Sequence, residues 1–133
     1  MATKNALIID DDMGILSICS GVLYKEGFNV VTAKTGMSAF EELYRNPFDL
    51  IITSLAMKAK NGFTVLGMVR ALSPRTPLIV FTAKECSVAC HFLPLLEPCA
   101  FIGKPCSDEM LASFVKGPLI NGTNGRGRTL QAL

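Results

Sequence analysis

The sequence lacks any apolar run of the roughly 18–20 residues that a membrane span needs. Its first residues, Met-Ala-Thr-Lys-Asn, do not form a secretory signal peptide. Only 18% of the residues are charged, and a net charge of +2 is too small to favour nucleic acid as a partner. We therefore expect a cytoplasmic protein that binds neither a membrane nor nucleic acid through this chain.

Zinc-binding spacing is also missing. The sequence has a single histidine, His91, and its five cysteines contain no CxxC pair. Structural zinc sites need four closely spaced cysteine or histidine ligands, so this pattern does not favour one. An odd number of cysteines without a secretory signal indicates reduced thiols that pack as small hydrophobic side chains. The cysteines are Cys19, Cys86, Cys90, Cys99 and Cys106.

The chain is rich in apolar residues. Hydrophobic residues make up 50% of its 133 residues, which suits the core of one domain and excludes a disordered chain. From Gly117 the composition changes to a glycine-rich, basic stretch. We expect one domain over residues 1–116 and a flexible tail over 117–133, which is too short for an output module.

Short apolar runs alternate with stretches whose apolar residues recur at helical spacing. Five runs are expected to form buried strands and five stretches to form helices, the fourth over 85–98 being interrupted by Pro94 and Pro98. This alternation is typical of an α/β fold with a doubly wound parallel sheet. The expected strands are Ala6–Ile9, Phe28–Thr32, Asp49–Thr53, Pro77–Phe81 and Cys99–Ile102.

Several residues are suited to begin or end these helices. Gly27 stands where the first helix should end, and Thr35, Asn61 and Ser107 can cap the amino ends of the second, third and last helices. The buried faces of these later helices are expected to include Phe40, Leu72, Met110 and Phe114.

Polar residues follow the ends of four expected strands: Asp10-Asp11-Asp12, Ser54, Thr82 and Lys104. Taken singly, each has a simpler interpretation as a solvated strand end, and the acid run could only begin a helix. Because the carboxyl ends of parallel strands share one edge, which is where such sheets bind ligands, all four are expected to converge there.

The motifs around these residues resemble the response-regulator receiver domain of two-component signalling over residues 4–116. They are Leu7-Ile-Ile-Asp10-Asp11, Asp49-Leu-Ile-Ile-Thr53 with Asn61-Gly62, Phe81-Thr82-Ala83, and Lys104-Pro105. The resemblance implies a flavodoxin-like five-stranded sheet of order 2-1-3-4-5 with five helices. It also implies a phosphorelay signalling module rather than an enzyme, with a histidine kinase or another signalling protein as partner.

The resemblance assigns roles by position. The acid pair and a backbone carbonyl would hold Mg²⁺, a hydroxyl and an ammonium would bind phosphoryl oxygens, and an aromatic residue would act in the conformational switch. The corresponding residues are Asp10, Asp11 and Ala56 for the metal, Thr82 and Lys104 for the phosphoryl group, and Phe101 for the switch.

The phosphoacceptor position departs from the family, because Ser54 stands where the resemblance requires an aspartate. A carboxylate is ionised at pH 7 and can attack a phosphohistidine, whereas a serine hydroxyl needs a base. Loss of one carboxylate should also leave Mg²⁺ binding weakened or absent. Lys58 stands where the family usually has proline, and Lys104 is expected to pair instead with Asp10 or Asp11.

Three interpretations of Ser54 follow, and the first is favoured. The protein is a degenerate receiver that acts by protein–protein contact without phosphorylation. Alternatively, another residue takes phosphate, such as Ser54 as an ester, Asp12 or Thr53. A third interpretation is that Ser54 is an engineered replacement in an ordinary receiver. A remote alternative, a small flavodoxin-like ligand-binding protein, would need a glycine-rich phosphate loop where three acids stand.

The expected partner surface is residues 84–110, which are apolar, carry few charges and contain two prolines that break helices. One expectation is a homodimer through this surface. The other is that the same side chains fill the core beneath a distorted helix.

Overall fold

The structure is a computed structural model, which describes residues 4–54, 62–82, 100–103 and 107–120. Its strands are β1 (Lys4–Ile9), β2 (Phe28–Ala33), β3 (Leu50–Ser54), β4 (Leu78–Thr82) and β5 (Ala100–Gly103). Its helices are α1 (Met13–Lys25), α2 (Gly36–Arg45), α3 (Gly62–Leu72) and α5 (Asp108–Ile120). The helix expected over 85–98 lies outside the described residues.

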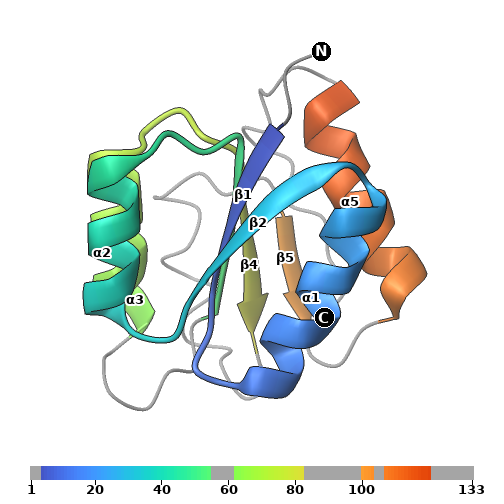
Figure 1. The fold of residues 1–133 in the computed structure, drawn as a ribbon, viewed down its shortest axis with the longest axis horizontal. Helices are drawn as coiled ribbons and strands as arrows, with labels where there is room; N and C mark the ends of the chain where they lie inside the picture. The colour runs from blue at the N-terminus through green and yellow to red at the C-terminus, as the bar shows by residue number, and fades with distance from the viewer. Residues whose placement is uncertain (1–3, 55–61, 83–99, 104–106, 121–133) are drawn as a thin grey trace.

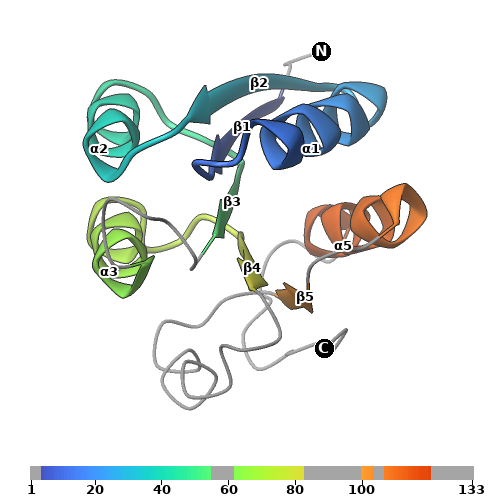
Figure 2. The ribbon, with the colours of Figure 1, turned by 90° about the horizontal axis from the view of Figure 1, so that it is seen from below.

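The five strands form one parallel sheet in the order β2-β1-β3-β4-β5 (Figure 1). Figure 2 shows the sheet between two helical layers, with α1 and α5 on one face and α2 and α3 on the other. The predicted α/β class, the flavodoxin-like fold and the strand order are therefore confirmed.

β1 and β3 are neighbours inside the sheet, and their apolar sequences are explained because helices cover both faces of the sheet. Every residue of β3 is buried, as are the last four residues of β1. A strand that alternated polar and apolar residues would place polar groups under one of the helical layers at a cost of several kcal/mol each.

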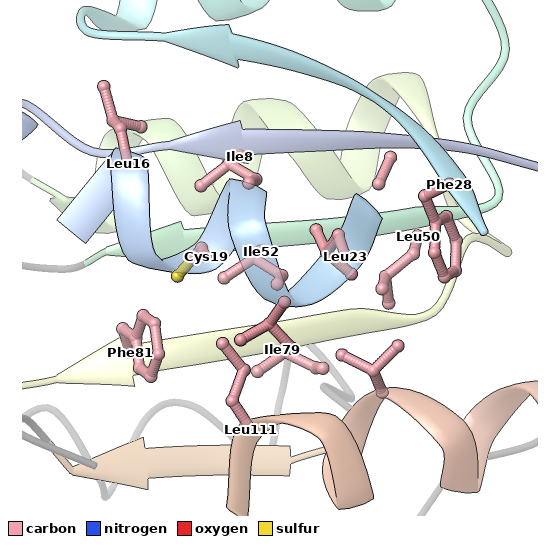
Figure 3. Packing of buried hydrophobic residues seen from close by; sticks show 13 residues of the cluster. Ile8, Leu16, Cys19, Leu23, Phe28, Leu50, Ile52, Ile79, Phe81 and Leu111 are labelled. Atoms are coloured by element: carbon pink, nitrogen blue, oxygen red, sulfur yellow. The ribbon is translucent and has the colours of Figure 1, made fainter. Parts of the chain in front are cut away.

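Each face of the sheet carries its own hydrophobic core. Leu7, Ile9 and Ile51 point toward α2 and α3, where they pack with Leu66 and Val69 among others. Their sequence neighbours point to the opposite face, because successive side chains of a strand alternate. Figure 3 shows this second core, in which strand residues meet α1 and α5; its labelled members are Ile8, Leu16, Cys19, Leu23, Phe28, Leu50, Ile52, Ile79, Phe81 and Leu111.

Three of the predicted helix ends are confirmed. The backbone of Gly27, which follows the end of α1, has φ +92°, a value that favours glycine. The Thr35 hydroxyl accepts a hydrogen bond from the Ser38 N–H at 3.0 Å, and the Ser107 hydroxyl accepts one from the Met110 N–H at 3.1 Å. The expected cap Asn61 lies outside the described residues.

Three side chains expected in the core are exposed instead. Phe40, Leu72 and Met110 have 41%, 37% and 41% of their surface accessible, because helical spacing alone does not determine how far each helix is rotated against the sheet. The side chain of Phe114 lies outside the described set. α5 also continues to Ile120, so regular structure extends past Gly117, where the tail was expected to begin.

Candidate functional site

The carboxyl ends of the strands bring the acid run and Ser54 to one edge of the sheet. Ile9 of β1 is paired with Thr53 of β3, so the next residues along each strand, Asp10 and Ser54, lie beside each other. Ile8 and Ile52, two residues before them, both belong to the core under α1 and α5. Strand alternation therefore directs Asp10 and Ser54 toward the same face.

The rest of the expected edge is described only in part. Thr82 ends β4 beside Gly103 of β5, which is the position predicted for it, but its side chain lies outside the described set. Phe101 lies in β5, where it is paired with Val80 of β4. Its side chain also lies outside the described set. The predicted residues Ala56 and Lys104 lie outside the described residues altogether, and so does the expected pairing of Lys104 with the acids.

Asp10 is held firmly by the backbone around it. Its side chain is 1% exposed, its N–H donates to the Ala33 carbonyl at 3.0 Å, and its Oδ1 accepts a hydrogen bond from the Asp12 N–H at 3.0 Å. Asp11 is half-buried beside it. A buried carboxylate requires compensating partners, and the hydrogen bond from the Asp12 N–H is one of those that hold Asp10 in place at the sheet edge.

The side chain of Asp12 caps a helix. Its Oδ1 accepts hydrogen bonds from the N–H groups of Gly14 at 2.8 Å and Ile15 at 3.3 Å, which makes it the amino-terminal cap of α1. The simpler interpretation of the acid run, that it begins a helix, is therefore right for Asp12. The sequence signal was an aspartate just before an apolar helical pattern.

Ser54 and Thr53 are both fully buried, at 0% exposure. Ser54 has a polar partner, whereas the Thr53 hydroxyl has no hydrogen-bond partner among the residues that the structure describes. Sequence reasoning missed this orphaned hydroxyl. Strand alternation was the available signal, because it directs Thr53 to the apolar core that contains Ile51.

The residues of this edge can be compared with what Mg²⁺ requires. In the part of the chain that the structure describes, no group of three or more His, Cys, Asp or Glu side chains could hold a metal. Asp10 and Asp11 provide two carboxylates, and Mg²⁺ accepts one or two carboxylates when water completes its coordination. The donor set therefore fits a hydrated Mg²⁺ ion, with Ser54 able to add only a neutral oxygen.

The sheet order and the acid pair at its carboxyl edge define a flavodoxin-like α/β domain with an anionic edge site. The chain belongs to the response regulator receiver domain family, whose profile matches residues 6–116. The predicted family is thus confirmed, and this is a family of two-component signalling modules.

Two known relatives support the assignment to this family. The chain is 35% identical over 77 residues to the transcriptional regulatory protein GlrR of Escherichia coli (strain K12), which covers 58% of this chain and 17% of GlrR. It is 30% identical over 113 residues to the transcriptional regulatory protein CpxR of the same organism, covering 85% of this chain and 48% of CpxR. The chain therefore spans less than half the length of either relative.

A solved structure matches the fold closely. The CheY-like receiver domain protein of Methanospirillum hungatei JF-1 has a TM-score of 0.84 and 25% identity, covering 90% of this chain and 96% of that protein.

Two further expectations concern membrane-spanning helices and the partner surface. Across the described residues, the structure contains no helix that is both long and apolar enough to cross a membrane. The expected partner surface at 84–110 falls mostly outside the described residues, which include only 100–103 and 107–110 of it.

Proposed function

We propose that this chain is a degenerate receiver domain, which signals by protein–protein contact without taking phosphate. The observation that carries the proposal is Ser54, at the end of β3 and beside Asp10, where the family motif requires the acceptor aspartate. Its partner would be a histidine kinase or another signalling protein. A homodimer through residues 84–110 is part of the same proposal.

The chemistry of the side chain supports this proposal. An acceptor aspartate is ionised at neutral pH and needs no base to attack a phosphohistidine. A serine hydroxyl must lose its proton as it attacks. The neighbouring carboxylate of Asp10 accepts a hydrogen bond from the Asp12 N–H and would be a ligand of any bound Mg²⁺, so it is poorly placed to act as that base.

The surroundings of the other candidate acceptors also favour the degenerate receiver. The Thr53 hydroxyl is fully buried on the side of β3 that faces the apolar core under α2 and α3, so a kinase active site has no access to it in this conformation. The Asp12 carboxylate is exposed but is used to cap α1. Lys58, four residues after Ser54 in the sequence, is a second departure from the family pattern, which supports natural divergence of this segment rather than a single engineered replacement.

Mg²⁺ binding is proposed to be weak. Asp10 and Asp11 would hold the ion together with water and the backbone carbonyl of Ala56. Bound there, Mg²⁺ would supply positive charge for phosphoryl oxygens. The backbone around Asp10 holds its carboxylate at the sheet edge next to Asp11, and Thr82 and Lys104 would be the groups that bind an anion beside this pair.

The proposal is tested by incubating the full chain with acetyl phosphate and Mg²⁺ and measuring its intact mass. We expect no change in mass. The Ser54→Asp variant is the matched control, since it restores the acceptor carboxylate and is expected to gain one phosphate. A stoichiometric gain of one phosphate by the unaltered chain would overturn the proposal.

A further inference from the structure

A shallow groove of about 450 Å³ lies at the opposite edge of the sheet from the acid pair. It is formed where α2 leads into β3 and where α3 leads into β4, so it lies at the amino ends of these strands. Figure 1 shows the two connections running close together from α2 and α3 toward the sheet. Its lining residues are Leu43–Phe48 and Leu72–Thr76.

The walls of this groove are fixed by hydrogen bonds. The Arg70 guanidinium donates to the carbonyl oxygens of Ser73 at 3.1 Å and Thr76 at 2.8 Å, which holds the α3–β4 connection in place. The Thr76 hydroxyl then donates to the Phe48 carbonyl at 3.5 Å and joins the two connections. A groove that is already ordered costs less conformational entropy when it binds a partner.

The charged residues that line the groove are all positive. Its lining contains two cationic residues, Arg45 and Arg75, and no aspartate or glutamate. Both arginines are exposed, and within the described residues neither makes an ion pair, although Glu41 stands one helical turn before Arg45. The nearby carboxylate of Asp49 accepts a hydrogen bond from the Asn5 N–H at 2.8 Å. Two guanidinium groups are thus available to carboxylates of a partner.

An exposed apolar stripe adjoins the groove along α2. Met37, Phe40 and Tyr44 recur at helical spacing and have 61%, 41% and 77% of their surface accessible. The rings of Phe40 and Tyr44 are stacked with centroids 6.0 Å apart, and Tyr44 also lines the groove. Large apolar side chains gathered on one exposed face are typical of an interaction surface.

We propose that this groove, together with the stripe on α2, binds an extended acidic segment of a partner protein in which carboxylates alternate with apolar side chains. In an extended segment successive side chains point to opposite sides, so carboxylates can meet Arg45 and Arg75 while apolar residues meet the exposed rings of Tyr44 and Phe40. Arginines beside aromatic rings also suit single-stranded nucleic acid. A lining with only two cationic residues and a net charge of +2 favour the peptide.

The site is independent of the chemistry at Ser54, since it lies at the other edge of the sheet. The test is a titration of the ¹⁵N-labelled full chain with a short synthetic peptide of alternating Glu and Phe, followed by amide chemical shifts. Saturable shifts are expected around residues 43–48 and 72–76, with a dissociation constant at or below about 1 mM. A peptide with Lys in place of Glu is expected not to bind.

Two charge-reversal variants identify the site. The double variant Arg45→Glu/Arg75→Glu is expected to weaken peptide binding at least about tenfold, because two attractions become repulsions. The matched control is Lys25→Glu/Lys34→Glu, which makes the same change in net charge away from the groove. Each double variant removes one cation from the last turn of a helix, Arg45 from α2 and Lys25 from α1. The control is expected to keep its affinity, and both variants should retain the amide spectrum of a folded chain.

Three results would overturn the proposal. One is the absence of saturable shifts up to millimolar peptide. Another is an equal loss of binding in both double variants, which would show attraction to net charge only. The third is stronger binding of a single-stranded oligonucleotide than of the peptide at the same residues.

Discussion

Thr53 and Ser54 follow one another on β3, and their hydroxyls lie in different surroundings. Ser54 faces the side of the sheet that carries Asp10 and has a polar partner. Thr53 faces the apolar core under α2 and α3, where it is 0% exposed and its hydroxyl has no hydrogen bond within the described part of the chain. A buried hydroxyl with no partner lowers the stability of the folded state by roughly 1–3 kcal/mol.

Thr53→Val is therefore expected to stabilise the protein. Valine has nearly the shape of threonine and removes the unsatisfied hydroxyl, so the free energy of unfolding should rise by about 1 kcal/mol. Urea denaturation monitored by circular dichroism measures this change. Thr32→Val, at an exposed position of β2, is the control and should change stability by less than about 0.5 kcal/mol. A destabilised Thr53→Val variant would show that the hydroxyl is satisfied in solution.

The residue at position 54 should also set the affinity for Mg²⁺. Ser54→Asp adds a third carboxylate beside Asp10, and hard anionic oxygens are the ligands that Mg²⁺ prefers. We expect isothermal titration calorimetry to show binding at least about tenfold tighter in the variant than in the unaltered chain, equivalent to about 1.4 kcal/mol. Micromolar affinity in the unaltered chain would contradict a weakened metal site.

Among the elements, α1 shows how local sequence sets both ends of a helix. Asp12 caps its first turn, and the chain leaves it through Gly27, whose φ of +92° carries a conformational penalty for any residue with a Cβ. No atom of residues 4–54, 62–82, 100–103 or 107–120 lies within 4 Å of where that Cβ would be, so the penalty at Gly27 is conformational rather than steric.

Two glycine substitutions in and after α1 should act in opposite directions. Gly27→Ala is expected to lower the free energy of unfolding by about 1–2 kcal/mol, because alanine disfavours positive φ. Gly21→Ala, at an exposed position inside the helix with open space around the new methyl group, should raise it by up to about 1 kcal/mol. Both are measured by urea denaturation. Equal effects at the two positions would contradict this account of how the helix ends.

The elements themselves could be predicted because their signals are local. Apolar runs fixed the strands to within a residue or two, and Thr35 and Ser107 marked the helix starts correctly. The exposure of Phe40 and Leu72 could not be predicted from helical spacing alone, because it depends on how far each helix is rotated against the sheet. The end of α5 was missed because Gly117 and Pro118 resemble a helix stop.

On the scale of the whole molecule, one sheet separates two cores. Ile9 of β1 belongs to the core under α2 and α3, and Ile79 of β4 belongs to the core under α1 and α5. β3 lies between the two strands, which places them roughly 9–10 Å apart. Their side chains share no neighbours in these clusters.

Substitutions in the two cores should therefore be additive. Ile9→Val and Ile79→Val are each expected to cost about 0.5–1.5 kcal/mol of unfolding free energy, and the double variant should cost their sum within about 0.5 kcal/mol. Chemical denaturation of the four proteins measures the coupling. A coupling above about 1 kcal/mol would show that the sheet transmits packing changes between its faces.

The site was predictable to the extent that strand order fixes which residues share an edge. The sequence placed Asp10 and Ser54 at the same edge, and the register of β1 and β3 confirms that they are neighbours. The groove at the other edge was not predicted. Its arginines lie at a helix end and in a connection, and their shared surface arises only when α2 and α3 pack together.

A degenerate receiver should keep one folded conformation whether or not a phosphodonor is present. The most direct test is the amide ¹H–¹⁵N spectrum of the unaltered chain with Mg²⁺, recorded before and after acetyl phosphate is added. We expect an unchanged spectrum for the unaltered chain, whereas Ser54→Asp should show new shifts near the ends of β3 and β4. New shifts at those strand ends in the unaltered chain would contradict this expectation.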